Sequence, residues 1–524
     1  MKNDNLYALI ESRLPRDLAA PCIETHDGLV YSWRDLHFAS ARLAGWLASL
    51  ALPRDPDGSA ARVAVQVEKS PEALMLYLAT LRAGLVYVPL NTAYQRAEVE
   101  YFLNDARPAV VVCSPARARQ IEPLARAAGV QHVLTLGERR DGTLLAAAAP
   151  FADSFGTVPR SADDLAAILY TSGTTGRSKG AMLTHGNLAS NALVLDEFWG
   201  FREEREAGGH DVLLHALPLF HVHGLFVASH AALLSGATML FLPKFDVRQV
   251  VERLPRATVF MGVPTYYTRL LAEPGFDRHV CRNMRLFISG SAPLLAETFN
   301  EFRKRTGHTI LERYGMSETL MLVSNPYFGT PRDRLAGTVG IPLPGVEVRV
   351  VKEGSQPCAI GEIGDVQVRG PNVFKGYWRM PEKTREEFTE DGWFKTGDVG
   401  AFGGPGKPDN YLTLVGRSND LIISGGFNVY PKEIESYIDE MAGVAESAVI
   451  GLPHPDFGEA VAAVIVARPG AAVDAAQVIA ALKEKIANYK VPKRVWIVDE
   501  LPRNAMGKVQ KNVLRDRYAG AFAR

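Results

Sequence analysis

Apolar positions in the first third of the chain predict short strands that alternate with helices. Runs rich in β-branched residues indicate strands, and apolar residues spaced three and four apart indicate helices. The strands are expected at residues 62–67, 86–90 and 109–113, and the helices at 71–82 and 98–103. This βαβαβ order predicts a parallel sheet that helices cover.

The pattern changes further along the chain. A similar strand and helix rhythm continues through residues 211–242, 259–260 and 285–290. Residues 224–242 carry no charge, and we expect them to form a buried helix followed by a buried strand. From about residue 337, short alternating strands separated by glycines predict an antiparallel or barrel-like layer. These strands are expected at residues 346–350, 365–369 and 411–415.

A break at residues 416–420 precedes a C-terminal segment with two helical and three strand patterns. We therefore expect an α/β protein of two domains. A large N-terminal domain, residues 1–418, would combine parallel α/β layers with a β-barrel-like layer, and a smaller, mobile α+β domain would span residues 419–524.

Composition excludes several classes of partner. Among the 524 residues, 58 Lys and Arg balance 58 Asp and Glu, so no net charge favours nucleic acid or an anionic membrane. The chain opens with polar residues and lacks the apolar core of a signal peptide. Its four cysteines are far apart in sequence, which disfavours a zinc site and favours a reducing cytoplasm. They are Cys22, Cys113, Cys281 and Cys358.

The most informative motif is YTSGTTGRSKG at residues 170–180, which directly follows an apolar run at 165–169 that predicts a buried strand. Glycines let backbone N–H groups approach an anion, and hydroxyls and Lys179 add donors and charge. The motif therefore predicts a loop that binds the phosphates of a nucleotide. Its spacing differs from a Walker A loop, and a flexible Gly/Ser/Thr linker is the alternative.

Four further segments fit the same chemistry. SGSAP at 289–293 offers small residues after a strand, and ERYGMSET at 312–319 groups an aromatic ring, a hydroxyl and a carboxylate. TGD at 396–398 places a carboxylate just after a turn. NAMGK at 504–508 ends in a lysine on a polar loop. In this order and at these separations, the motifs resemble those of the adenylate-forming enzymes, which include acyl-CoA synthetases, adenylation domains and luciferases. The resemblance spans about residues 25–515. Segments 312–319 and 218–224 are most similar to malonyl-CoA synthetases.

The resemblance implies a two-step reaction. A carboxylate attacks the α-phosphorus of ATP to give an acyl-adenylate and pyrophosphate, and the thiol of coenzyme A then displaces AMP. Glu318 and Thr171 would hold Mg²⁺, which prefers hard oxygen ligands. Asp398 and Arg417 would bind the ribose, and Tyr314 would stack on the adenine. The other nucleotide-binding residues implied are Ser172, Gly173, Thr174, Thr175, Gly176, Lys179, Ser289, Gly290, Ser291, Ala292, Glu312, Arg313, Gly315, Met316 and Ser317.

The C-terminal segment would contribute a mobile catalytic group. By resemblance, Lys508 bridges the attacking carboxylate and the α-phosphate, and it is a candidate substrate for a lysine acetyltransferase. An ordinary solvated lysine is the alternative. Asn419 occupies the hinge position, where relatives usually carry Asp or Lys. Ser424, Gly425 and Gly426 resemble the segment that lines the coenzyme A channel, although a plain turn before a helix fits almost as well.

The identity of the acid rests on cationic side chains near the expected pocket. Arg313 and Arg269 would bind the distal carboxylate of malonate, because the guanidinium group matches a carboxylate with two parallel hydrogen bonds. His223, Val222 and Met316 would line the pocket and limit bulk at C2, where methylmalonate is a second substrate to consider, and His221 would occupy a gating and catalytic position.

Several alternatives remain open at this point. In one alternative, neither arginine binds the acid: Arg313 pairs with Glu312, and Arg269 is a surface residue. The enzyme would then be an acyl- or aryl-CoA synthetase for another short acid. An adenylation domain that loads a carrier protein and a nucleotide-binding protein without catalysis are the remaining rivals.

Overall fold

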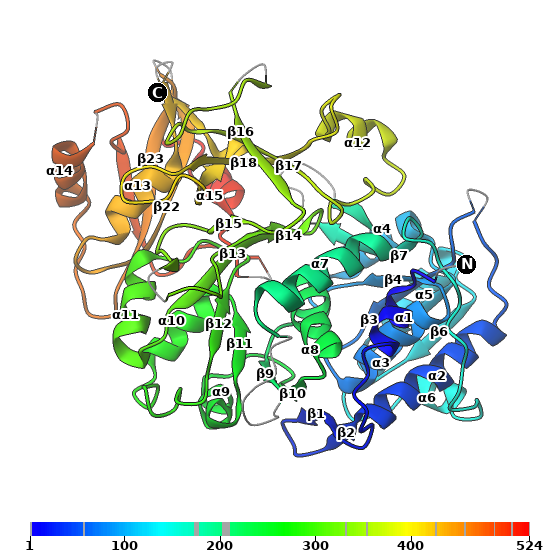
Figure 1. Ribbon diagram of the computed structural model, residues 1–524. Helices are drawn as coiled ribbons and strands as arrows, with labels where there is room; N and C mark the ends of the chain where they lie inside the picture. Colours follow the sequence, from blue (N-terminus) through cyan, green and yellow to red (C-terminus); the bar gives the residue numbers. More distant parts are fainter. Residues whose placement is uncertain are drawn as a thin grey trace.

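The computed structural model describes residues 3–55, 58–171, 178–201, 210–330, 333–352, 355–424, 427–454, 457–486, 488–504 and 507–522 of the chain. Within these ranges the strands form four sheets. Figure 1 shows a blue to cyan sheet at the right, a green sheet below left, a yellow-green layer above them, and the orange to red C-terminal part at the upper left.

The first sheet confirms the predicted βαβαβ order. It has six strands in the order β6-β5-β3-β4-β7-β8, and all neighbours are parallel except β7 and β8. Its strands are β3 (Arg62–Gln66), β4 (Val86–Pro89), β5 (Val110–Cys113), β6 (His132–Thr135), β7 (Leu165–Thr171) and β8 (Lys179–Thr184). Its helices and those of the N-terminal segment are α1 (Leu6–Glu11), α2 (Trp33–Ser49), α3 (Pro71–Arg82), α4 (Arg96–Ala106), α5 (Ala118–Ala127) and α6 (Thr143–Ala148).

Helix α3 illustrates why the sequence pattern was reliable here. Ser70 caps it by accepting the backbone N–H of Ala73, and Pro71 lies in the first turn, where its missing N–H has no intrahelical partner to lose. Every residue of α3 is buried, as expected for a mostly apolar helix enclosed by other elements; its polar exceptions are Glu72, Thr80 and Arg82.

The second sheet has nine strands in the order β15-β14-β13-β12-β11-β9-β10-β1-β2. Its centre, from β13 to β1, is parallel, and the carboxyl ends of its strands therefore meet at one edge. Its strands are β1 (Pro21–Thr25), β2 (Val30–Ser32), β9 (Val212–His215), β10 (Thr238–Phe241), β11 (Val259–Gly262), β12 (Leu286–Ser289), β13 (Ile310–Met316), β14 (Leu320–Ser324) and β15 (Ile341–Pro342). The helices of this region are α7 (His185–Phe198), α8 (His230–Ser235), α9 (Val247–Arg253), α10 (Pro264–Ala272) and α11 (Ala296–Thr306).

The uncharged stretch at residues 224–242 is a buried helix followed by a strand, as predicted. A π-helix (His223–Ser229) continues directly into α8, and β10 follows. Among the described residues, no helix is long and apolar enough to cross a membrane.

The third sheet is an antiparallel layer of four strands in the order β16-β17-β18-β19. Its strands are β16 (Glu347–Val351), β17 (Gly364–Arg369), β18 (Phe394–Phe402) and β19 (Leu412–Arg417), and α12 (Pro381–Glu387) lies in one connection. One local prediction was wrong: residues 396–398 lie inside β18 rather than just after a turn. Gly397 adopts a φ of 70° within the strand, so the irregularity that the motif suggested is a kink in a strand and not a loop.

The C-terminal part forms its own sheet and its own apolar core. Strands β20, β21, β22, β23 and β24 make a five-stranded sheet, and the residues of each core cluster here all come from this segment. Its elements are β20 (Ile422–Ser424), β21 (Phe427–Val429), α13 (Pro431–Asp439), β22 (Val444–His454), β23 (Gly458–Ala467), α14 (Ala475–Lys485), β24 (Arg494–Val498) and α15 (Lys511–Tyr518). The domain boundary at residues 418 and 419 stays a prediction.

Candidate active site

The predicted site residues gather where strands of two sheets end. Thr171 is the last residue of β7, and Ser289 is the last residue of β12. Open α/β sheets place their ligands outside the carboxyl ends of such strands. Thr171 pairs with Lys179 across the β7–β8 hairpin. The rest of the predicted phosphate loop, Ser172, Gly173, Thr174, Thr175 and Gly176, lies outside the described residues.

Tyr377 contacts both Lys179 and Glu318, although no sequence pattern had identified this tyrosine. The Tyr377 hydroxyl donates to Glu318 Oε1 at 3.0 Å, and Lys179 Nζ lies 4.5 Å from the centre of the Tyr377 ring and 3.7 Å from Glu387 Oε1. Burial raises the pKa of Glu318. A single carboxylate beside a phosphate loop fits Mg²⁺, because this ion takes few protein ligands and completes its shell with water and phosphate oxygens. Within the described ranges, no cluster of three or more metal-ligating side chains forms an alternative site.

Asp398 is held rigidly as a hydrogen-bond acceptor. It lies opposite Arg417 in the β18–β19 pair, and its Oδ1 is 2.9 Å from Arg417 Nε. Arg417 also donates from Nη1 to the carbonyl of Thr396 at 3.0 Å, and the Tyr314 hydroxyl donates to Asp398 Oδ2. The carboxylate is therefore oriented before any ligand arrives. This arrangement suits a ribose diol, whose two hydroxyls need fixed acceptors.

Lys508 reaches this cluster from the C-terminal sheet. Its loop packs on the first turn of α10, because a Cβ added to Gly507 would lie 3.8 Å from Thr265 Oγ1. Lys508 is exposed at its surface, yet burial of its ammonium group lowers its pKa, and Arg417 adds to this effect. The carboxylates of Asp398, Asp420 and Glu318 raise the pKa of Lys508. The ammonium group therefore faces the predicted nucleotide site.

Arg313 is buried without a hydrogen-bonded partner for two of its three nitrogens. Its exposed fraction is 3%, and its Nε and Nη2 find no acceptor among the described residues. Its guanidinium packs on Gly290, where an added Cβ would come within 2.3 Å of it. Burial lowers the pKa of Arg313 to about 9. In the described part of the chain, no ion pair joins it to Glu312, so that alternative to the carboxylate clamp is not observed.

The histidines beside Arg313 are neutral at physiological pH. Burial lowers the pKa of His221 to about 4 and lowers that of His223 well below its ordinary value, and the charge of Arg313 contributes to both shifts. His223 Nδ1 lies 3.5 Å from Ser291 Oγ, whereas His223 Nε2 and Ser289 Oγ have no partner among the described residues. These orphaned polar atoms indicate a polar ligand, because buried donors and acceptors are normally satisfied.

The π-helix positions this histidine segment. A Cβ on Gly224 would lie 2.0 Å from the carbonyl oxygen of Pro218, so only glycine allows the chain to fold back here. Val222 is buried at the start of this π-helix, and Met316 is half-buried at the end of β13. Gly315 and Ser317 lie beside Met316 in the connection between β13 and β14, and Ala292 follows Ser291 after β12.

Arg269 is the predicted acid-binding residue that the structure does not connect to the pocket. It is exposed on α10. Its role stays a prediction.

The predicted hinge and channel residues lie at the start of the C-terminal sheet. Asn419 belongs to a short 3₁₀ turn (Ser418–Asp420), and the Ser418 hydroxyl donates to Asp365 Oδ1 at 3.0 Å. Arg515 on α15 pairs with Asp420. Ser424 is buried at the end of β20, whereas Gly425 and Gly426 lie outside the described residues.

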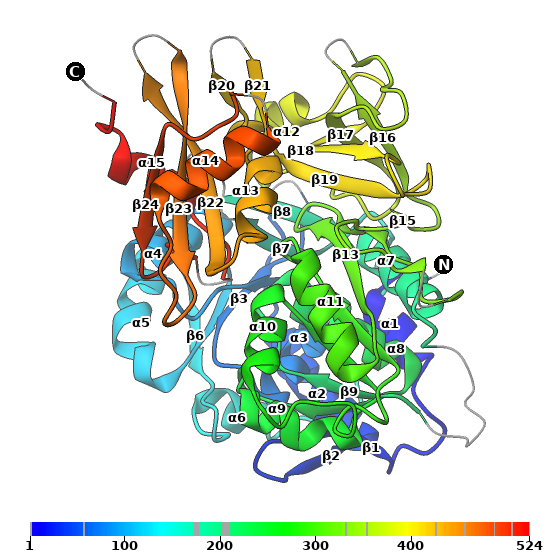
Figure 2. The same ribbon diagram turned by 90° about the vertical axis from the view of Figure 1, so that its left-hand side faces the viewer.

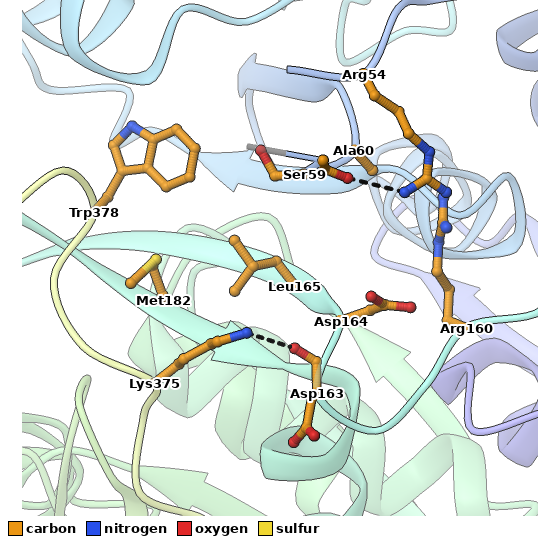
Figure 3. A pocket seen from close by; sticks show the side chains of 11 residues that line it. Arg54, Ser59, Ala60, Arg160, Asp163, Asp164, Leu165, Met182, Lys375 and Trp378 are labelled. Atoms are coloured by element: carbon orange, nitrogen blue, oxygen red, sulfur yellow. Dashed lines mark hydrogen bonds between the residues drawn. The ribbon is translucent and has the colours of Figure 1, made fainter. Parts of the chain in front are cut away.

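The cavity in Figure 3 is separate from this site. It measures about 250 Å³ and lies at the end of the β7–β8 hairpin opposite Thr171, beside Leu165 and Met182. None of the predicted site residues lines it. Lys375 donates to the carbonyl of Asp163 at its rim, as Figure 3 shows.

Glu312 is a buried carboxylate with one satisfied oxygen. Its Oε1 accepts the backbone N–H of Leu294 at 3.0 Å, and its Oε2 has no partner among the described residues. Burial raises the pKa of Glu312 to about 7, although Lys432 on α13 lowers it somewhat. The native state therefore keeps a proton on Glu312 between pH 4.5 and 7 that the unfolded chain has lost. Stability contributed by this group falls as pH rises through that window.

We predict that Glu312→Gln stabilises the fold at pH 8, where the wild type carries a buried charge. The gain should be up to about 3 kcal/mol at pH 8 and smaller at pH 5.5. The measurement is the melting temperature of both proteins at the two pH values. Glu435→Gln is the control, because Glu435 is equally buried but paired with Lys511 at 2.6 Å, so this change should destabilise at pH 8. If Glu312→Gln changed the melting temperature equally at both pH values, the raised pKa of Glu312 would be contradicted.

Known proteins match the whole chain. Residues 12–378 match the AMP-binding enzyme family, and residues 433–508 match the AMP-binding enzyme C-terminal domain. A malonate–CoA ligase of Arabidopsis thaliana is 37% identical over 487 residues, which cover 87% of this chain and 78% of that protein. A feruloyl-CoA synthase of an Amycolatopsis species is 35% identical over 500 residues, which cover 94% of this chain and 95% of that protein.

The most informative solved structures are two forms of MatB from Rhodopseudomonas palustris. The ATP-bound form is 53% identical with a TM-score of 0.93, and the apo form is 52% identical with a TM-score of 0.83; each comparison covers 99% of this chain and 100% of MatB. The TM-scores show that this chain superposes better on the ATP-bound form than on the apo form. With its large α/β part and its small C-terminal part both matched, the chain belongs to the AMP-binding enzyme family of adenylate-forming enzymes.

Proposed function

We propose that the protein ligates malonate to coenzyme A through a malonyl-adenylate, with ATP converted to AMP and pyrophosphate. The observation that carries this proposal is the buried guanidinium of Arg313, which has no anionic partner among the described residues. Leaving such a charge unpaired costs several kcal/mol, on the order of 3–5 kcal/mol. A dicarboxylic acid supplies the missing anion, and a monocarboxylic acid whose single carboxylate is adenylated does not.

The pocket chemistry also supports a small diacid. His221 and His223 are neutral, so they offer hydrogen bonds without a second full charge that would favour a larger anion. Val222 and Met316 are the apolar neighbours that would limit bulk at C2, and whether methylmalonate is accepted depends on them.

In the first step, the residues on the large part of the chain would fix the nucleotide. Lys179 and the loop that begins at Thr171 would bind the β- and γ-phosphates, and Asp398 with Arg417 would bind the ribose. Mg²⁺ would neutralise phosphate charge, and Glu318 and Thr171 are the residues that would hold it. Lys508 would donate to the attacking carboxylate oxygen and the α-phosphate, where negative charge develops.

The second step requires a different position of the C-terminal part. We infer that rotation about Asn419 withdraws Lys508 and brings Ser424, Gly425 and Gly426 to the site, where they line the path of the coenzyme A thiol. Glycines in this segment would let a narrow substituent pass close to the backbone. The free thiols of Cys22, Cys113, Cys281 and Cys358 support the cytoplasmic location predicted from the sequence.

We predict that Arg313→Met removes the preference for a diacid. For malonate, kcat/KM should fall about 10²-fold or more, since a buried charge pair is lost, while the KM for ATP should change little. Pyrophosphate release is measured for wild type and variant with malonate, methylmalonate, propionate, butyrate and benzoate. Wild-type activity with butyrate or benzoate but not malonate would favour the rival, an acyl- or aryl-CoA synthetase.

Arg334→Met is the matched control for this substitution. Arg334 is a half-buried arginine whose pKa is also lowered by burial, but it donates to the backbone carbonyls of Pro326, Thr309 and Tyr327. Its removal should lower the melting temperature without changing the ratio of malonate to propionate activity. An equal loss for both acids in Arg313→Met would refute the clamp.

We predict that Lys508→Ala abolishes adenylation and preserves the second step. Adenylation, measured as malonate-dependent exchange of pyrophosphate into ATP, should slow about 10²–10³-fold, because a positioned cation is lost from the developing charge. Conversion of preformed malonyl-AMP and coenzyme A to the thioester should continue. Lys511→Ala is the control, because Lys511 pairs with Glu435 and should affect stability rather than the ratio of the two steps. Loss of both steps in Lys508→Ala would exclude the assigned role.

We also infer that Lys508 is the acceptor for a lysine acetyltransferase. Its side chain is accessible, and acetylation would remove the charge that adenylation requires. We expect intact mass spectrometry of an inactive pool to show a single acetyl group on Lys508, and deacetylation to restore adenylation. An inactive pool with unmodified Lys508 would contradict this regulation.

A further inference from the structure

One ion pair links the C-terminal part of the chain to the large part at a distance from the reacting groups. Arg468, which follows β23, donates from Nη2 to both carboxylate oxygens of Glu297, at 2.7 and 2.8 Å. Glu297 lies in the first turn of α11. Figure 1 shows α11 below the orange C-terminal part, and Figure 2 shows it below and to one side of that part, so the pair spans the boundary between the two.

Arg468 is oriented by its own side of the boundary before it meets Glu297. Its Nε donates to the carbonyl of Val444, at the start of β22, at 2.9 Å. This contact fixes the plane of the guanidinium, so little side-chain freedom is lost when the carboxylate binds. The side chains of Arg468 and Glu297 are 49% and 55% exposed, so salt should screen their attraction strongly.

Arg468 and Lys508 belong to the same sheet-and-helix unit. The loop that carries Lys508 is tied to β22 by the ion pair between Arg503 and Glu446, and Arg468 is tied to the first residue of β22. A contact that holds Arg468 against α11 therefore also restrains where Lys508 lies. Near the reacting end, a Cβ added to Gly507 would lie 3.8 Å from Thr265 Oγ1 on α10, which is no closer than ordinary van der Waals distance.

We propose that Arg468 and Glu297 form a positioning pair that favours the arrangement in which Lys508 faces the nucleotide. The pair lies across the two parts that must separate if Lys508 is to withdraw, so it would support adenylation and would have to break before thioester formation. This inference rests on the proposed two-step function. An exposed salt bridge is strong enough to bias the equilibrium between the two positions of the C-terminal part, and weak enough to break between the two steps.

The test compares the two half-reactions in Glu297→Gln and in Arg468→Met. The ratio of the adenylation rate to the thioester rate from preformed acyl-adenylate should fall about two- to fivefold in each variant, the range that an exposed ion pair supplies. The double exchange Glu297→Arg with Arg468→Glu should restore part of the ratio. The wild-type ratio should itself decline toward that of the variants as salt is raised, because screening removes the same attraction.

Glu347→Gln provides a matched control within the large part of the chain. Glu347 accepts from Arg369 Nε and Nη2 at 3.0 and 2.9 Å between β16 and β17, and the exposed fractions of Arg369 and Glu347, 46% and 57%, resemble those of the proposed pair. The ratio of the adenylation rate to the thioester rate in Glu347→Gln should equal that of the wild type. An unchanged ratio in Glu297→Gln, or an equal change in Glu347→Gln, would overturn the proposal.

The acid used in this test is whichever acid the wild type adenylates. Failure of the wild type to adenylate malonate would count against the proposed function alone. The ratio measured with another acid would still decide whether Arg468 and Glu297 position the C-terminal part.

Discussion

The site is organised around a charge that the protein buries and does not neutralise. Arg313 is anchored on β13 between two strands, and its guanidinium lies on Gly290, where any larger residue would displace it. Burial lowers the pKa of His221 and His223, and the charge of Arg313 lowers both further, so the two histidines are neutral beside it. The proposed preference for a second carboxylate on the substrate rests on this one guanidinium.

The nucleotide side of the site follows a different physical logic. Arg417 and Tyr314 both contact Asp398, so the proposed acceptor for the ribose is oriented in advance. Glu318 is likewise oriented by Tyr377. Lys508, the proposed catalytic cation, belongs to the C-terminal part. In the proposed mechanism, the fixed groups therefore belong to the large part and the group that withdraws between steps belongs to the small one.

Much of the fold was predictable because its signals are local. Helix α3 carries its own cap and its own proline at the first turn, and the strands around it are short runs of β-branched residues, so neighbouring residues alone specify the βαβαβ unit. Residues 396–398 were placed wrongly because a glycine with positive φ also occurs in a kinked strand, and only pairing with β17 and β19 distinguishes the two. Tyr377, Glu387 and Glu297 gave no signal, since each acts through a partner distant in sequence.

The sequence alone determined the class of chemistry, because its short ordered motifs resemble those of adenylate-forming enzymes and predict a phosphate loop, a ribose acceptor and a mobile lysine. It left undecided whether Arg313 pairs with Glu312, whether Arg269 reaches the acid, and where Lys508 lies. Tertiary structure decided the first, by burying Arg313 away from any carboxylate in the described residues, and the last, by placing Lys508 beside Asp398 and Glu318. These outcomes depend on long-range packing and desolvation, which no local pattern of residues encodes.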